Sequence, residues 1–569
     1  MRRPDRTTLA LAGVLLGAAI LRVWGIRHGL PFSYNVDEEG HFVPVAIGFF
    51  GHDLNPGYFL NPPGYTELLY VVYAVWFGGR DAVAQAYAEH PGEVFLIARV
   101  TVALLGMLSI ALLYAAGARF FDRRVGLLAA AIGACAFLPV FYSHLALNDV
   151  PATAPAALAL LGAALILRGG GTGAALLGGV GAGLAAGTKY TAGIALLPLL
   201  SAILVQARDQ RGAFLRAAVV PVLAACAAAL AGFLVTNPYA LLDFETFRAG
   251  VGRQRTLASG EELSKLGLTQ ESGVLYYLWT LTWGLGWIPA LAALGGAVRL
   301  LLRDRALALV LLPAPVLFVL FMGLQERYFG RWLLPVLPIA ILLAASFGLA
   351  SIRAVAARAP RLALPAGALV VAALLGQGLV TTIHNDRVLS REDTRGAART
   401  WLLANVPAGA RVVLEPIVPA RWLQDPDRAD PATPAGARWR VWDTARADVD
   451  DAGRRLPAGR TRFVKVDKYE RTLRPELIDR YEAGGWCWVV TGSTQFERAL
   501  AQPGEVPQAI AYYDALDRRG EQVARFSPYD AGADPPRFNF DWSFDYYPLA
   551  YERPGPEIVV HRLRGGRCA

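Results

Sequence analysis

Three consecutive carboxylates, Asp37-Glu38-Glu39, lie just beyond the first hydrophobic stretch of this 569-residue chain, and His41 follows them. Charged side chains are costly inside a lipid bilayer. Acids at the end of an apolar span are therefore either solvated loop residues or groups that take part in catalysis or binding. A carboxylate such as Asp37 can take a proton from a hydroxyl and make that oxygen a better nucleophile. The triplet is therefore the first candidate for a catalytic site.

Three further polar clusters stand at links between apolar runs, on the same predicted side of the membrane as the triplet. They contain His144 with Asp149, Lys189 with Tyr190, and Arg327 with Arg331. A phosphate anchored in lipid lies at the headgroup level, where Lys189 and one of the two arginines can hold it, the arginine in a bidentate manner.

Acids and cations at one membrane depth suit a single type of reaction. The acid takes a proton from an acceptor hydroxyl while that hydroxyl attacks a sugar carbon, and the fixed cations stabilise phosphate as the leaving group. No metal is strictly required, because the leaving group carries one phosphate that the cations can neutralise. We therefore predict no cofactor, and whether a divalent ion assists stays open.

The elements that must position these residues are membrane spans. The chain is 54% hydrophobic and 18% charged, whereas a soluble domain carries about 25% charged residues. Apolar runs long enough to cross a bilayer lie at 8–26, 94–117, 125–142, 151–167, 173–187, 191–206, 217–235, 275–298, 306–323, 332–352 and 362–382. The fold class predicted is a polytopic α-helical membrane protein with about eleven transmembrane helices.

Arginines mark the cytoplasmic side of these spans. The net charge is +9, but nucleic-acid binding is rejected, because the arginines cluster in short loops as the positive-inside rule requires. They are Arg2, Arg3, Arg6, Arg119, Arg123, Arg124, Arg208, Arg211, Arg216, Arg299, Arg303, Arg305, Arg353, Arg358 and Arg361. We expect a multi-pass protein of the cytoplasmic membrane, with the N-terminus inside as a retained signal anchor and long outer loops at 27–93 and 236–274.

The last part of the chain differs from the rest. Charged residues and prolines become more frequent, and short β-rich runs such as 411–414, 462–466, 486–490 and 557–561 alternate with helical patterns. This predicts a membrane domain at 1–384 and a soluble α/β domain at 385–569 outside the membrane. The chain has only four cysteines, at 135, 226, 487 and 568, and their spacing shows neither a disulfide framework nor a metal site.

Several stretches resemble one family. Asp37-Glu38 after the first span is similar to the acidic motif of the GT-C glycosyltransferases, most closely the bacterial members of the family of protein O-mannosyltransferases and the aminoarabinose transferase of lipid A. The other matching stretches are Asn61-Pro-Pro-Gly-Tyr65, Tyr142-Ser-His-Leu-Ala-Leu-Asn-Asp149-Val-Pro151, Gly183-Leu-Ala-Ala-Gly-Thr-Lys189-Tyr190, Thr236-Asn-Pro-Tyr239 and Arg331-Trp-Leu-Leu-Pro-Val-Leu-Pro338. The resemblance covers about residues 8–382.

This resemblance implies an inverting transfer of a sugar from a polyprenyl-phosphate donor. It implies Asp37 as the catalytic base with Glu38 supporting it, and Asp149 as a second acid that orients the acceptor or the sugar. Lys189 and the arginine before the Leu-Leu-Pro stretch match contacts to the lipid phosphate, with Tyr190 beside them. The family's Arg-Tyr-Leu-Leu-Pro is here Arg331-Trp-Leu-Leu-Pro335, while an Arg-Tyr pair stands at Arg327-Tyr328, so either arginine can make the contact.

The remaining assignments concern the substrate. The predicted substrate contacts are His41, His144 and Tyr65, and Glu39 is expected to support the site or to face solvent. We expect the donor sugar to be mannose or an arabinose-like sugar, and the acceptor hydroxyl to belong to a protein, a glycan or a lipid. No Trp-Trp-Asp motif of the oligosaccharyltransferases is present, which argues against transfer to asparagine.

Two other functions remain as alternatives. A transporter or flippase for a polyprenyl-linked sugar would also need acids and cations, but transporters usually place them near the bilayer midplane, in repeated halves. Here the charged residues cluster at one face, and no second half repeats the first. A non-catalytic assembly protein with an interaction tail is the other alternative. Cleavage of the sugar lipid distinguishes the enzyme from both.

Overall fold

The computed structural model describes residues 5–208, 214–259, 266–267, 272–426, 436–450, 453–530, 532–533, 535–536, 538 and 549–569. Arg2, Arg3 and Arg211, which belong to the predicted cytoplasmic clusters, and part of the outer loop 236–274 lie outside these residues.

Helices form at every one of the eleven apolar runs. They are α1 (Arg6–Val23), α5 (Pro91–Phe120), α6 (Arg123–Cys135), α7 (Phe137–Phe141), α8 (Thr153–Ile166), α9 (Gly171–Thr188), α10 (Leu196–Arg208), α11 (Phe214–Val235), α14 (Gly273–Leu281), α15 (Trp287–Arg303), α16 (Arg305–Leu311), α17 (Pro313–Gly323), α18 (Leu337–Arg358) and α19 (Ala363–Leu389). In the described part, eight helical spans are long and apolar enough to cross a membrane, and the bent pair α6–α7 would make a ninth. The prediction of a polytopic helical membrane protein is confirmed.

Small residues bring α8, α9 and α11 into close contact. A side-chain carbon added at Gly183 of α9 would lie 2.0 Å from the carbonyl oxygen of Ala229 in α11, and one at Gly162 of α8 would lie 2.5 Å from the Cα of Gly178. Membrane helices associate through such glycine contacts, because apolar burial drives nothing between them in lipid. The packing fixes the end of α9, where Lys189 follows.

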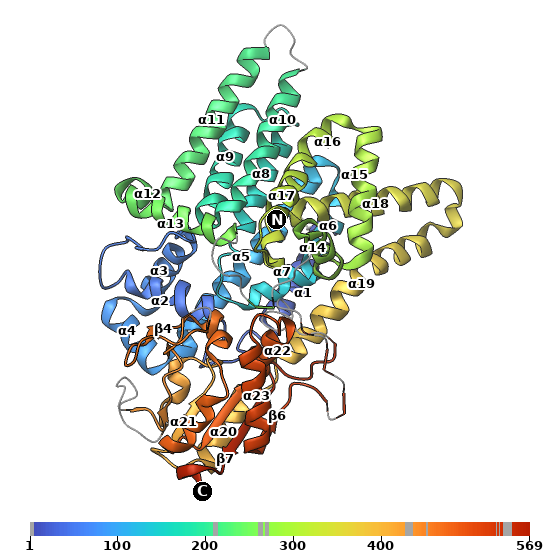
Figure 1. Cartoon of the computed structure of the whole chain (residues 1–569). Helices are drawn as coiled ribbons and strands as arrows, with labels where there is room; N and C mark the ends of the chain where they lie inside the picture. The colour runs from blue at the N-terminus through green and yellow to red at the C-terminus, as the bar shows by residue number, and fades with distance from the viewer. Residues whose placement is uncertain are drawn as a thin grey trace.

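The two predicted outer loops are largely helical. The first contains the π-helix η1 (Glu38–Phe42), α2 (Val43–Gly48), α3 (Gly64–Phe77) and α4 (Arg80–Glu89), and the second contains α12 (Tyr239–Leu242) and α13 (Phe244–Ala258). Figure 1 shows α2, α3 and α4 between the membrane helices and the soluble domain, and the C-terminal end of α10 and the N-terminal end of α11 at the end of the molecule away from the soluble domain.

The soluble part contains a five-stranded sheet among its described residues. The strand order is β2-β1-β5-β7-β6, with β2, β1 and β5 parallel and with β7 and β6 antiparallel to their neighbours. The bounds are β1 (Arg411–Leu414), β2 (Arg440–Val441), β5 (Trp488–Gly492), β6 (Gly520–Phe526) and β7 (Ile558–Leu563), with helices α20 (Thr394–Asn405), α21 (Glu476–Gly484), α22 (Ser493–Ala501) and α23 (Pro507–Arg519). The run at 462–466 forms only β4 (Arg462–Phe463), paired with β3 (Arg446–Ala447) outside this sheet.

A disulfide joins Cys487 and Cys568, so the expectation that the cysteines show no disulfide framework was wrong. The two residues stand 81 positions apart, and a single pair at that separation leaves no spacing signature. The fold brings them together, because Cys487 directly precedes β5 and Cys568 lies in the short helix η10 (Gly566–Cys568), which contacts α21.

The soluble domain packs on the outer loops of the membrane domain. The guanidinium of Arg395 lies 3.7 Å from the ring centre of Tyr34, and Arg421 donates to the Tyr87 carbonyl at 2.6 Å. Leu266, from the second outer loop, is buried in the core of the soluble domain. Helix α19 runs on to Leu389, past the predicted division at residue 384.

Candidate active site at the membrane surface

Four of the predicted site residues meet in one ion-pair network. Arg331 donates through Nη2 to Asp37 Oδ2 at 3.0 Å, and its Nε lies 3.7 Å from Asp149 Oδ2. The ammonium of Lys189 pairs with the other oxygen of Asp149. The residues come from the start of η1, the α7–α8 link, the α9–α10 link and the short 3₁₀ helix η5 (Gly330–Leu333).

Burial differs sharply across this network. The Asp149, Lys189 and Arg331 side chains are 4%, 10% and 14% exposed, whereas the Asp37 side chain is 38% exposed. Solvent or a substrate can therefore reach Asp37, while the other three groups are held inside. The two cations balance the charges of Asp37 and Asp149, so an anion that binds here has to compete with these carboxylates for Lys189 and Arg331.

The backbone around Asp37 is held by a local turn. The Asn35 side-chain oxygen accepts hydrogen bonds from the backbone N–H groups of Asp37 and Glu38 at 3.1 and 3.2 Å. The π-helix η1 begins at once and carries His41, whose ring stacks on Tyr58 at 5.0 Å. Single π-helical turns are rare and occur often at functional sites.

Glu38 faces the interior instead of the open site. It is fully buried, and its carboxylate accepts two hydrogen bonds from Arg99 at 2.7 Å, one from the Ser33 hydroxyl at 2.6 Å and one from the Ala146 N–H at 2.9 Å. These four bonds use its acceptor capacity. Glu38 thus fastens η1 to α5 and to the link that carries Asp149.

Arg327 and Arg331 share one aromatic ring. Their guanidinium carbons lie 5.0 and 4.8 Å from the centre of the Phe329 ring. Burial and the neighbouring Arg331 charge lower the pKa of Arg327, while Asp37 and Asp467 of the soluble domain act in the opposite direction. Two desolvated cations at this distance from one ring favour an anion between them.

Two predicted substrate contacts lie elsewhere. His144 is fully buried, with its ring nitrogens 3.0 and 2.9 Å from the carbonyl oxygens of Val140 and Trp24. Tyr65 is 1% exposed and donates to the Ala98 carbonyl of α5. Both side chains are buried in packing contacts in the structure, and their role as substrate contacts stays a prediction. Tyr190 donates to the Phe59 carbonyl at 3.1 Å.

Sequence reasoning missed Arg99, Tyr58 and Phe329. Arg99 is a lone charge within the apolar run 94–117, and an ionisable residue inside a span is itself a functional signal. Tyr58 and Phe329 had no such signal, because aromatic residues at a membrane surface are common.

No group of three or more His, Cys, Asp or Glu side chains in the described part of the chain is placed to hold a metal ion. Metal independence stays a prediction.

Solved structures with the same architecture define the fold. The chain aligns with the oligosaccharyltransferase of Archaeoglobus fulgidus in its apo form with a TM-score of 0.52 and 13% identity, over 95% of this chain and 75% of that one. The GT-C superfamily contains this neighbour. The chain has the GT-C fold. The fold predicted from Asp37-Glu38 and its companion motifs is thus confirmed.

Two further solved structures are similar to the chain. The A. fulgidus enzyme AglB, in complex with an inhibitory peptide and a dolichol-phosphate, aligns with a TM-score of 0.50 and 13% identity, over 93% of this chain and 75% of that one. ArnT from Cupriavidus metallidurans bound to undecaprenyl phosphate aligns with a TM-score of 0.48 and 14% identity, over 97% of each chain.

Sequence comparison gives a more local result. Residues 86–237 match the family model described as dolichyl-phosphate-mannose-protein mannosyltransferase. This stretch includes Asp149 and Lys189 but neither Asp37 nor Arg331. No curated protein sequence matches the chain.

Proposed function

We propose that this GT-C protein transfers a sugar from a polyprenyl-phosphate donor to an acceptor hydroxyl, with inversion at the sugar carbon. The observation that carries the proposal is the network of Asp37, Arg331, Asp149 and Lys189, which is open to solvent only at Asp37. It provides a reachable base beside buried cations in a bilayer-spanning fold.

The proposed step moves one proton and one sugar. Asp37 takes the proton of the acceptor hydroxyl while the oxygen forms a bond to the anomeric carbon. The bond between that carbon and the phosphate oxygen breaks, and the polyprenyl phosphate leaves with the electron pair. Attack from the face opposite the phosphate inverts the configuration. Arg331, Arg327 and Lys189 stabilise the charge that develops on the phosphate.

Arg331 must change partners during this cycle. In the structure it is bound to Asp37 and lies beside Asp149. A donor phosphate offers a guanidinium a bidentate partner, so the donor competes with both carboxylates for Arg331. When Arg331 moves to the phosphate, Asp37 loses its hydrogen-bond donor and becomes a stronger base. Donor binding would thus precede activation of the base.

Two relatives support a polyprenyl-phosphate donor. AglB was solved with a dolichol-phosphate, and the family model that matches residues 86–237 is named for dolichyl-phosphate-mannose. A polyprenyl-phosphate mannose is therefore the first donor to test, and the acceptor hydroxyl belongs to a protein, a glycan or a lipid.

The proposal assigns the reaction to the outer face of the cytoplasmic membrane. The arginine-rich turns predict one cytoplasmic side, and Figure 1 shows the C-terminal end of α10 and the N-terminal end of α11 away from the soluble domain. The Cys487–Cys568 disulfide gives independent support, because disulfides persist in oxidising compartments and are rare in the cytosol.

A reconstitution assay tests the proposal against its alternative. Vesicles that contain the full chain receive polyprenyl-phosphate mannose and a mixture of envelope acceptors, and both lipid products and acceptors are analysed by mass spectrometry. Transfer releases polyprenyl phosphate in the same molar amount as mannosylated acceptor. Intact donor that appears on the opposite leaflet, without free polyprenyl phosphate, would show a flippase and sink the proposal.

A further inference from the structure

A cavity lies where the ends of α1 and α19 meet the start of α20, away from the Asp37 network. Its volume is about 670 Å³, and residues from two segments, 23–34 and 389–400, line it. Figure 1 shows α19 leaving the membrane helices and entering the soluble domain at this place. The cavity is therefore at the level where the bilayer surface meets the soluble domain.

Charged side chains line the cavity, and two of them are already paired. The lining charges are Arg27, Arg391, Glu392, Asp393 and Arg399. Asp393 forms two hydrogen bonds of 2.8 Å with Arg395, and Arg391 pairs with Glu552. The first contact neutralises the buried acid Asp393, and the second neutralises the cation Arg391.

The remaining charges favour an anion. Arg399 donates at 2.7 Å to the carbonyl oxygens of Trp422 and Gln424, which orient it without cancelling its charge. Within the described ranges, no carboxylate forms an ion pair with Arg27 or Arg399. The exposed Glu392 is the unpaired acid of the lining, and Asp425, which also acts on the Arg399 charge, is itself paired with Arg438.

One wall of the cavity belongs to the surface that faces lipid. Val23, which lines the cavity, is 54% exposed, and Ile20, one turn earlier on α1, is 56% exposed. Val380 and Ile383 on α19 are exposed as well. Apolar side chains exposed near the end of a membrane span contact acyl chains. A ligand of this cavity therefore meets cations at one end and hydrocarbon at the other.

We propose that this cavity binds the phosphate-bearing headgroup of an anionic membrane lipid, with Arg27 and Arg399 as its cationic contacts. The acyl chains would lie against α1 and α19. This site is distinct from the donor phosphate site at Arg327 and Arg331 and does not depend on the transferase proposal. Tyr34 lines the cavity three residues before Asp37, so a bound lipid would steady the segment that carries the base.

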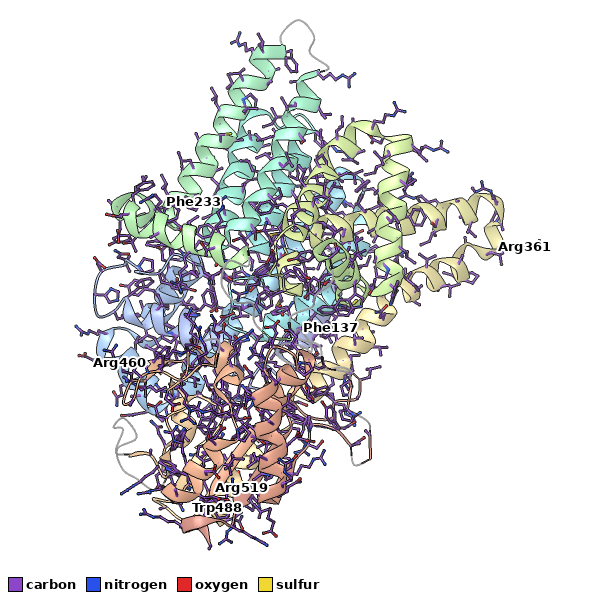
Figure 2. All side chains as sticks on the ribbon, in the orientation of Figure 1. Phe137, Phe233, Arg361, Arg460, Trp488 and Arg519 are labelled. Carbon is purple, nitrogen blue, oxygen red and sulfur yellow. A yellow bond between two sulfur atoms is a disulfide. The ribbon has the colours of Figure 1, made fainter. Side chains whose placement is uncertain are left out.

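Native mass spectrometry of the purified full chain tests this site. The protein is titrated with phosphatidylglycerol, with phosphatidylcholine and with the soluble anion glycerol 3-phosphate. The variants are Arg27→Glu, the charge-preserving Arg27→Lys, and Arg460→Glu as a matched control. Arg460 is exposed on the soluble domain and, as Figure 2 shows, lies on the side opposite α19.

We expect Arg27→Glu to weaken phosphatidylglycerol binding about tenfold or more, because each basic residue near a bilayer surface attracts anionic lipid and this change reverses the charge. Binding of phosphatidylcholine stays the same, Arg27→Lys and Arg460→Glu behave like the unchanged protein, and glycerol 3-phosphate binds far more weakly. Unchanged phosphatidylglycerol binding by Arg27→Glu overturns the proposal. So does an equal loss for both lipids, or equally tight binding of glycerol 3-phosphate.

Discussion

Arg331 contacts carboxylates from two different segments, and this changes the view of the site drawn from residue types alone. Acids and cations at one membrane face predicted a base on one side and a phosphate clamp on the other. The structure instead joins them, since Arg331 binds Asp37 at 3.0 Å and lies 3.7 Å from Asp149. Spacing in the sequence cannot reveal such a bridge, because 294 positions separate Arg331 from Asp37.

The geometry of Arg331 gives a first prediction. Lysine keeps the charge but cannot present donors to a phosphate and two carboxylates through a planar fork. We expect Arg331→Lys to lower kcat/KM about tenfold or more, which corresponds to one lost hydrogen bond to a charged group. Arg327→Lys is the comparison variant, because Arg327 lies over the same Phe329 ring but forms no ion pair with a carboxylate among the described residues, so its loss should be smaller. Equal losses in both variants would contradict the bridging role.

A second prediction at this scale concerns Glu415 in the soluble domain. Burial raises its pKa to about 8, although Gly492 N–H and the Tyr513 hydroxyl donate to it at 2.8 and 2.7 Å. The folded protein therefore binds an extra proton between the ordinary pKa of a glutamate and about 8, so the free energy of unfolding falls as pH rises through that range.

Glu415→Gln should remove this dependence. Glutamine can accept from Gly492 and donate to the Tyr513 oxygen without a charge. In thermal unfolding we expect the variant to be more stable than the unchanged protein at pH 8, with the difference shrinking toward pH 5. Glu521→Gln, an exposed side chain of β6, serves as the control. A difference that is constant with pH would rule out titration of Glu415.

At the scale of elements, one buried ion pair connects three segments of the site. Glu38 at the start of η1 accepts hydrogen bonds from Arg99 of α5 and from the backbone N–H of Ala146, which lies three residues before Asp149. The resemblance implied Asp37 as the base and Glu38 as its support, and in the structure Asp37 is open while Glu38 is buried. Arg99, in contrast, was counted only as part of an apolar run, because the length rule for spans ignores a single charge.

Removing one member of this pair leaves the other buried and unpaired. We expect Arg99→Met to lower the free energy of unfolding by about 3–5 kcal/mol and to reduce transfer through misplacement of Asp149. Thermal unfolding of the full chain in detergent measures the first effect. Arg353→Met is the control, because the Arg353–Asp122 pair is exposed, and such pairs contribute about 0–1 kcal/mol. Similar losses for the two variants would contradict a central role for Arg99.

Elements were predictable where one physical rule dominated. All eleven apolar runs are helical, because a backbone in lipid must satisfy its own hydrogen bonds. The outer loops were predicted only as loops, although α4 and α13 are helices there. The composition of these loops is mixed and polar, so the hydrophobicity of the sequence does not indicate helices there. The helices are supported by contacts with distant segments, such as that of Phe247 in α13 with Phe59.

At the scale of the whole molecule, the disulfide and the arginine-rich turns give independent information on orientation. The Cys487–Cys568 bond closes a long segment of the soluble domain. If that domain is outside the cytoplasm, Cys568→Ser should destabilise it by about 2–5 kcal/mol, measured by proteolysis of membranes in increasing urea. Cys226→Ser, which removes an exposed free cysteine, should have no such effect. Identical urea profiles for both variants would place the soluble domain in a reducing compartment.

The central claim is that Asp37 is the base of a sugar transfer from a polyprenyl phosphate. Its most direct test is the initial rate of transfer by Asp37→Asn in membranes supplied with polyprenyl-phosphate mannose, alongside Glu39→Gln from the same triplet. Asparagine keeps the shape of the side chain and removes the base, so the rate should fall by about 10²–10⁴, with donor binding retained. Glu39→Gln should transfer at close to the unchanged rate. Full transfer by Asp37→Asn would contradict the account.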